Sequence, residues 1–212
     1  VWFSSVALSF AVLIGAIIAP AAIAPAAIAP AAIAPAASVA LTSDSPPGFL
    51  LLWTLYSAHL AFAFLLLAFS ASPLKGTWPN KATRGLMRYR RQIGLGFATA
   101  HGFHLVALTL FLSNLESFSV DISLAVAGFG YAVTAALAVT SNNRSVRHLG
   151  INRWRLLHST GINILMLYFF VALSASLFTQ PYTVNALYVL IIIIAVASKR
   201  RMQRETLTLT TD

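Results

Sequence analysis

The sequence predicts an all-α protein: a polytopic transmembrane helical bundle of about six spans, with both termini in the cytoplasm. Two observations predict this fold class. The 212 residues are 58% hydrophobic and only 9% charged, whereas a soluble domain carries about 25% charged residues. The Lys and Arg residues also gather in alternate connections between apolar runs, a charge pattern that orients membrane helices.

Six apolar runs approach the length of about 20 residues that a helix needs to cross a bilayer. They cover residues 2–19, 49–72, 93–113, 121–141, 156–178 and 182–198. The chain is therefore divided into a first transmembrane span or signal-like segment (1–19), an outer linker (20–48), a membrane bundle (49–198) and a basic cytoplasmic tail (199–212). The first segment lacks the basic residues with which a signal peptide begins, which favours an uncleaved span.

The linker region contains a perfect repeat. Residues 18–37 are four copies of Ile-Ala-Pro-Ala-Ala. A proline at every fifth position repeatedly removes helical hydrogen bonds, and in lipid the freed backbone groups find no water. The pattern favours a spacer outside the membrane, with a proline-rich strip that binds a partner as the alternative.

The fourteen basic residues all fall on one side of the membrane if the spans alternate. They lie in three segments: Lys75, Lys81, Arg84, Arg88, Arg90 and Arg91; Arg144, Arg147, Arg153 and Arg155; and Lys199, Arg200, Arg201 and Arg204. The opposite connections carry Asp44, Glu116 and Asp121 and no basic residue. The positive-inside rule places the basic segments in the cytoplasm, and we expect a multi-pass protein of the inner cell membrane. Topology also explains the net charge of +9, so no nucleic acid partner is expected.

Histidines are the candidate site residues. The chain has no cysteine, which excludes thiolate-ligated haem, Fe–S clusters and cysteine-rich zinc sites. An ionisable side chain inside a span usually faces the bundle interior and serves a site, and imidazole is a common metal and haem ligand. The candidate cofactor ligands are His59, His101, His104 and His158.

Depth in the membrane separates these four histidines. At a rise of 1.5 Å per helical residue, His59 and His104 lie about 20 Å from the cytoplasmic ends of their spans. His101 lies at about 15 Å and His158 at about 5 Å. A haem held by two imidazoles needs ligands at similar depth on different helices, so His59 pairs with His104 or with His101. His158 then serves a second cofactor, or the buried histidines only form hydrogen bonds between helices.

Two motifs resemble those of the ferric-reductase-like transmembrane family. The first is a pair of arginines, an Ile-Gly start to a span, and a histidine thirteen residues after the second arginine: Arg90, Arg91, Ile93, Gly94 and His104. The second is Leu-Gly, Trp and Leu-His before an aromatic-rich span, with one residue more than usual before the tryptophan: Leu149, Gly150, Trp154, Leu157 and His158. The resemblance covers about residues 72–178 and is greatest to the MsrQ (YedZ) group of haem-binding membrane subunits.

The resemblance implies a membrane subunit that binds haem b and carries electrons across the lipid bilayer. The electrons would come from a separate cytoplasmic flavin reductase or a quinol and pass to an external redox acceptor protein or membrane complex. FMN or a quinone is a further candidate cofactor. The chain has no Gly-rich dinucleotide fingerprint after a strand, so it would be the electron-transfer subunit of a transmembrane oxidoreductase.

One position departs from the family pattern. The family has a further histidine thirteen residues beyond the one that matches His158, and Val171 stands there. His59 has the depth to replace that ligand. The alternative is a non-catalytic membrane subunit that has lost haem and acts in complex assembly. A small transporter with histidine proton relays is disfavoured, because no Asp or Glu lies well inside a span.

Overall fold

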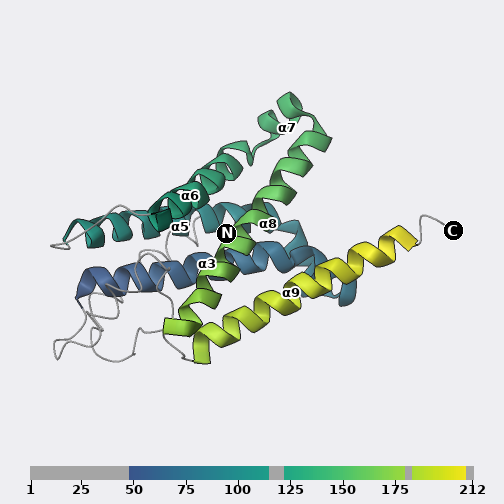
Figure 1. Cartoon of the computed structure of the whole chain (residues 1–212). Coiled ribbons are helices and arrows are strands. Elements are labelled where there is room, and N and C mark those ends of the chain that lie inside the picture. The colour runs from purple at the N-terminus through teal and green to yellow at the C-terminus, as the bar shows by residue number, and fades with distance from the viewer. Residues whose placement is uncertain (1–47, 115–121, 180–182, 209–212) are drawn as a thin grey trace.

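The computed structural model describes residues 48–114, 122–179 and 183–208, and these residues are all-α (Figure 1). They form seven helices: α3 (Phe49–Thr77), α4 (Lys81–Arg88), α5 (Arg90–Ser113), α6 (Ile122–Thr140), α7 (Asn143–Leu149), α8 (Ile151–Thr179) and α9 (Thr183–Thr208). The predicted first span and the Ile-Ala-Pro-Ala-Ala repeat lie outside the described residues. The all-α prediction is confirmed for the part of the chain that the structure describes.

Helix α3 is the centre of the bundle. It packs along α5 more extensively than along any other helix, and it also contacts α8 and α9. Its apolar residues Phe62, Leu65 and Phe69 form the main core with residues of the other three helices. Because α3 is covered on several sides, it can be apolar over most of its length, as a helix in the core of a bundle is.

The six-span prediction is confirmed only in part by the described residues. Three described helices are long and apolar enough to cross a membrane: α3, α5 and α8 over Ile151–Ala175. A fourth candidate is the pair Leu124–Thr140 and Asn143–Leu149, which is bent by 96°. Helix α9 joins its apolar run to the basic tail in one continuous helix. By length and composition, the described residues therefore support three or four spans, and the predicted first span lies outside them.

The end of helix α3 lies beyond the predicted boundary at residue 72. Helix α3 continues past Pro73 to Thr77, because a proline in a membrane helix is tolerated where neighbouring groups satisfy the freed backbone.

Helix α4 begins at a capping box, in which the Asn80 side chain accepts from the Thr83 backbone N–H and the Thr83 hydroxyl accepts from the Asn80 backbone N–H. Between α7 and α8, Gly150 has a φ of 76°, a left-handed conformation that disfavours residues with a Cβ.

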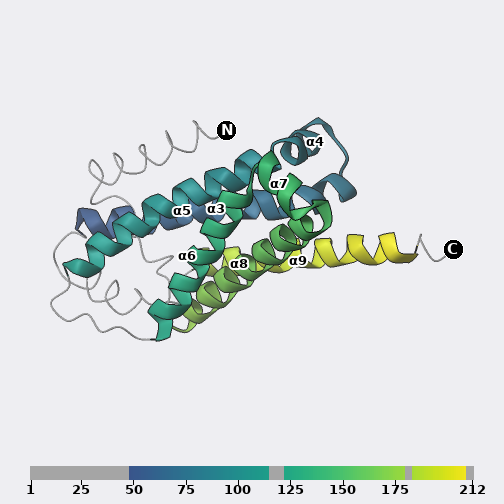
Figure 2. The ribbon, with the colours of Figure 1, turned by 90° about the horizontal axis from the view of Figure 1, so that it is seen from above.

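The basic segments gather at one end of the bundle. Figure 2 shows α4 and α7 at the same end, with the basic half of α9 extending on that side. The Arg91 guanidinium donates to the Ser141 carbonyl and, at 2.8 Å, to Asn143 Oδ1, which ties the start of α5 to the α6–α7 bend. At the end of α3, the Ser72 hydroxyl lies 4.0 Å from Met202 Sδ of α9. The structure thus brings together the three segments that the positive-inside rule placed on one side.

Candidate functional site

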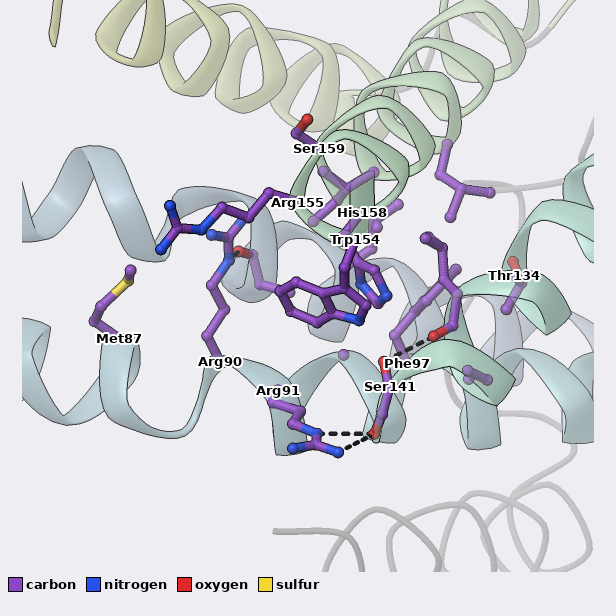
Figure 3. Close-up of a pocket in the computed structure, with 18 of the residues that line it drawn as sticks. Met87, Arg90, Arg91, Phe97, Thr134, Ser141, Trp154, Arg155, His158 and Ser159 are labelled. Atoms are coloured by element: carbon purple, nitrogen blue, oxygen red, sulfur yellow. Dashed lines mark hydrogen bonds between the residues drawn. The ribbon is translucent and has the colours of Figure 1, made fainter. Parts of the chain in front are cut away.

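A cavity of about 510 Å³ opens at the basic end of the bundle, between α3, α5, α6 and α8 (Figure 3). Its volume lies within the range of roughly 300–1,000 Å³ that is typical of ligand and cofactor pockets. Small residues from three helices line it: Ala68, Gly94, Ala98 and Ala138. Because these side chains are short, the space between the helices stays open toward the bundle interior.

Arginines form the rim of this cavity. Four of them line it: Arg88, Arg90, Arg91 and Arg155. Figure 3 shows the Arg90 and Arg155 side chains pointing toward one another from α5 and α8. The Arg90 Nε donates to the Ala68 carbonyl at 2.9 Å, which fixes this guanidinium against α3. No Asp or Glu is among the described residues that line the cavity, and a rim of this charge favours an anionic group.

His158 is the one histidine among the residues that line the cavity. Its ring stacks on Trp154 with a centroid distance of 4.2 Å, and its Nε2 lies 3.0 Å from the Thr140 hydroxyl of α6. That hydroxyl donates to the Ala136 carbonyl at 2.7 Å, so its oxygen accepts from His158 Nε2–H. The Trp154 indole donates to the Thr140 carbonyl at 2.9 Å. The Trp–His pair of the second motif is thus anchored on the last turn of α6.

His101 and His104 lie deeper in the bundle, away from the basic end. They are 5% and 3% exposed, and their rings stack with centroids 5.8 Å apart. His101 also stacks on Tyr131 of α6 at 4.2 Å. The His101 Nδ1 and the Tyr131 hydroxyl are buried without a hydrogen-bond partner in the described structure. Ring stacking is therefore the contact that the described structure shows between these two side chains.

His104 is held differently. Its Nδ1 lies 3.0 Å from the Thr54 carbonyl and 3.2 Å from the Ser57 hydroxyl, both on α3. Thr54, Ser57 and His104 are all buried. The imidazole thus joins the two most closely packed helices of the bundle.

The structure does not bring His59 and His104 together in one contact. His59 Nδ1 lies 3.2 Å from the Tyr188 hydroxyl of α9, and the two rings meet edge to face at 5.8 Å. His104 contacts α3 through Thr54 and Ser57. Among the described residues there is also no group of three or more His, Cys, Asp or Glu that could hold a bare metal ion. The axial pair His59–His104 stays a prediction.

Val171 lies on the outer face of α8, where it is 58% exposed. At 100° per residue, thirteen residues carry the helix about 140° away from the direction of His158. The departure from the family pattern thus falls at an exposed position. On α8, the buried Phe169 is the residue whose ring faces His101, at a centroid distance of 6.1 Å.

Sequence reasoning did not identify the residues that contact the histidines, among them Thr140, Ser57 and Tyr131. These three are polar residues within apolar runs, and no motif in the sequence marks them as contacts of a histidine. Lys199 was assigned to the tail, but its Nζ donates to Asn163 Oδ1 of α8 at 2.7 Å and lies 4.3 Å from the centre of the Phe69 ring. The first residue of the predicted tail therefore belongs to the bundle.

Comparison with known proteins shows a distant similarity. The chain is 29% identical over 158 residues to the magnetosome protein MamZ of Paramagnetospirillum magneticum, an alignment that covers 70% of this chain and 23% of that protein. The chain therefore spans about a quarter of the length of MamZ. No family model matches the chain. No solved structure matches it either. Together with the spanning helices, the similarity identifies a multi-pass helical membrane protein.

Proposed function

We propose that this protein is a membrane subunit that binds haem b and transfers electrons across the bilayer. In the full chain we propose six spans in the inner cell membrane, with both termini in the cytoplasm. The donor is a separate cytoplasmic flavin reductase or a quinol, and the acceptor is an external redox protein or membrane complex. The ferric-reductase-like motifs support this proposal, because each contributes residues to one cavity.

The cavity at the basic end is the observation that carries the proposal. It combines an imidazole, His158, with small residues that leave room for a flat ring and arginines that suit two carboxylates. These are the groups that a haem with its propionates requires. When bound, the haem supplies a reversible one-electron carrier near the cytoplasmic face.

The chain's own residues have distinct roles in this site. Arg90 and Arg155 bind and orient the carboxylates, and Arg90 is already fixed on α3 by its bond to Ala68. Trp154 covers one face of His158 and excludes water from it. For His158 to bind a metal through Nε2, its hydrogen bond to Thr140 must first open. His59, His101 and His104 stay candidate ligands for a second level deeper in the membrane.

A non-catalytic membrane subunit without haem is the second candidate function. The observation that favours it is the packing of the deeper histidines, because stacking on Tyr131 and bonds to α3 give each a structural role. The similarity to MamZ, a magnetosome protein, is compatible with either function. A role in an internal membrane compartment is a further proposal that this similarity suggests.

An absorbance difference spectrum separates the two candidates. The protein is purified from cells with ample haem supply, and the dithionite-reduced minus oxidised spectrum is recorded. We expect a b-type band that is lost or strongly weakened in His158→Ala and unchanged in His148→Ala. His148 is the matched control because it lies exposed on α7. A wild-type protein that carries no haem would overturn the proposed function and leave the assembly role.

A further inference from the structure

Helix α4 carries a narrow ridge of basic side chains. Lys81, Arg84 and Arg88 are all exposed. At 100° per residue these three positions fall within an arc of about 60° around the helix, so their side chains leave it in one direction. No Asp or Glu occurs between residues 45 and 115, so neither α4 nor the helices before and after it supply a carboxylate to this ridge. The ridge is therefore available to anionic groups outside the bundle.

The opposite side of α4 is fixed to the bundle. Thr83 is buried, and its hydroxyl donates to the Trp78 carbonyl at 2.7 Å. Leu86 and Met87 are half-buried, and Met87 also lines the cavity. Because this side of the helix is held in place, the fold directs the basic ridge away from the bundle.

The length of α3 places α4 at the level of the lipid headgroups. Helix α3 has 29 residues, which extend over about 43 Å at 1.5 Å per residue. A bilayer is about 40–45 Å thick with its headgroup regions, and its hydrocarbon core is about 30 Å thick. Helix α3 is thus long enough to cross both headgroup layers, and α4 begins at Lys81, shortly after α3 ends at Thr77. Figure 2 shows α4 at the end of α3 and α5.

Two exposed aromatic side chains flank the ridge. Trp78 precedes α4 and is 69% exposed, and Tyr89 follows it and is 45% exposed. The Arg88 guanidinium lies 5.7 Å from the centre of the Tyr89 ring, so the tyrosine lies beside the ridge. Tryptophan and tyrosine are enriched at membrane interfaces, where their rings sit at the level of the headgroups. Helix α7, the other short helix at the basic end, has exposed arginines but no tryptophan or tyrosine.

We infer that α4, with Trp78 and Tyr89 at its ends, is a binding site for the headgroups of anionic phospholipids. The basic ridge contacts the lipid phosphates, and the two aromatic rings lie among the headgroups. An acidic protein would also match the charge of the ridge, but the depth of α4 and its exposed aromatic rings favour a lipid. The inference goes beyond the proposed function, because it involves neither His158 nor a cofactor.

The fluorescence of Trp78 tests the inference. The purified protein is reconstituted in phosphatidylcholine vesicles that contain either brominated phosphatidylglycerol or brominated phosphatidylcholine at the same mole fraction. The Trp78 signal is the difference between the wild type and Trp78→Phe. We expect the anionic lipid to quench this signal more than the neutral lipid, and the excess to shrink at high salt, which screens exposed charges. Both lipids are compared on the same protein, so the result does not depend on whether haem is bound.

Charge variants of the ridge give the matched comparison. Lys81→Gln/Arg84→Gln removes two charges from the ridge and leaves Arg88 in place at the cavity. One basic residue near an anionic membrane surface strengthens binding by about five-fold, so we expect the preference for phosphatidylglycerol to fall by about five-fold or more. Lys81→Arg/Arg84→Lys, which keeps both charges, should retain the preference. Arg144→Gln/Arg147→Gln is the control, because it removes the same charge from exposed positions of α7.

Several outcomes would overturn the inference. Equal quenching by the two lipids in the wild type means that α4 does not recognise the headgroup charge. An unchanged preference in Lys81→Gln/Arg84→Gln, or an equal loss in the α7 control, means that the ridge is not the site. If neither lipid quenches Trp78, α4 lies in water beyond the bilayer, and an acidic protein is then the partner that the ridge fits. All substituted side chains are exposed, and thermal unfolding of each variant verifies that the fold is retained.

Discussion

At the scale of single residues, the position of each histidine along its span was predictable, whereas its direction was not. A rise of 1.5 Å per residue separates His158 from the deeper His101 and His104, and the structure places His158 at the basic end and the other two inside the bundle. The direction of a side chain depends on the rotation of its helix, which small residues and packing decide. For this reason the Tyr188 partner of His59 could not be predicted from the sequence.

His59 and Tyr188 give a test of the axial role that its depth suggests. If His59 binds the haem iron, His59→Ala removes the b-type band, whereas Tyr188→Phe keeps it because the imidazole remains. If the contact at 3.2 Å is only a bridge between α3 and α9, both variants keep the band. Each should then lower stability by about 1 kcal/mol, the usual value of one hydrogen bond. Difference spectra and thermal unfolding of the purified variants measure the two effects.

Lys199 gives a prediction for pH. Burial, and then the nearby charge of Arg90, lower the pKa of Lys199 to about 8 from 10.5. Between these values the unfolded chain binds more protons than the folded one, so this residue's contribution to stability rises with pH. Below about pH 8 both states are protonated, and the cost of the buried charge is fully present. We expect the stability of the wild type to rise relative to Lys199→Met between pH 8 and 10.5. A constant difference in thermal unfolding across this range would contradict the prediction.

At the scale of helices, apolar runs predicted which elements exist, and local chemistry decided where they end. Helix α4 was not predicted, since its eight residues form no apolar run, yet Asn80 and Thr83 form the capping box that starts it. The proline at position 73 suggested the end of a span, but α3 continues for four residues. The bend between α6 and α7 follows Thr140. At this bend the Arg91 guanidinium donates a hydrogen bond to the Ser141 carbonyl. Such helix ends depend on local caps and on contacts with residues distant in the sequence, and a hydropathy pattern shows neither.

Gly161 tests the packing of α8 on α6. A Cβ at this position would lie 2.8 Å from Leu137 Cδ2 and 3.0 Å from Cδ1, so the leucine must move in Gly161→Ala. Overpacking of this kind costs about 1–3 kcal/mol. Leu137 also lines the cavity, so we expect weaker haem binding together with a lower unfolding temperature. Gly128→Ala on α6 is the control, because a Cβ there has no neighbour within 4 Å. Equal stability of the two variants would show that the α6–α8 interface is looser than described.

At the scale of the whole molecule, the charge distribution and the fold agree on which segments lie together. The basic segments that include α4 and α7 meet at the cavity end. There, Arg91 joins α5 to the α6–α7 bend. The composition predicted this grouping because it depends only on the alternation of apolar and basic segments. The side of the membrane that this end faces is a separate question, and the absence of cysteine makes it accessible to experiment.

Single cysteines provide the test of topology. Ala82, His148 and Gln203 are exposed at the basic end of α4, α7 and α9, and Asn114 is exposed after α5. Each is replaced by cysteine in turn, and spheroplasts are treated with a membrane-impermeant maleimide before and after permeabilisation. We expect Asn114→Cys to react in intact spheroplasts and the other three to react only after permeabilisation, because basic connections stay in the cytoplasm. Reaction of His148→Cys from outside while Ala82→Cys stays protected would mean that α5 and α6 do not cross as a pair. Under the proposed function, the cavity and its arginines could then not face one cytoplasmic electron donor, and a single electron-entry site at the basic end would be excluded.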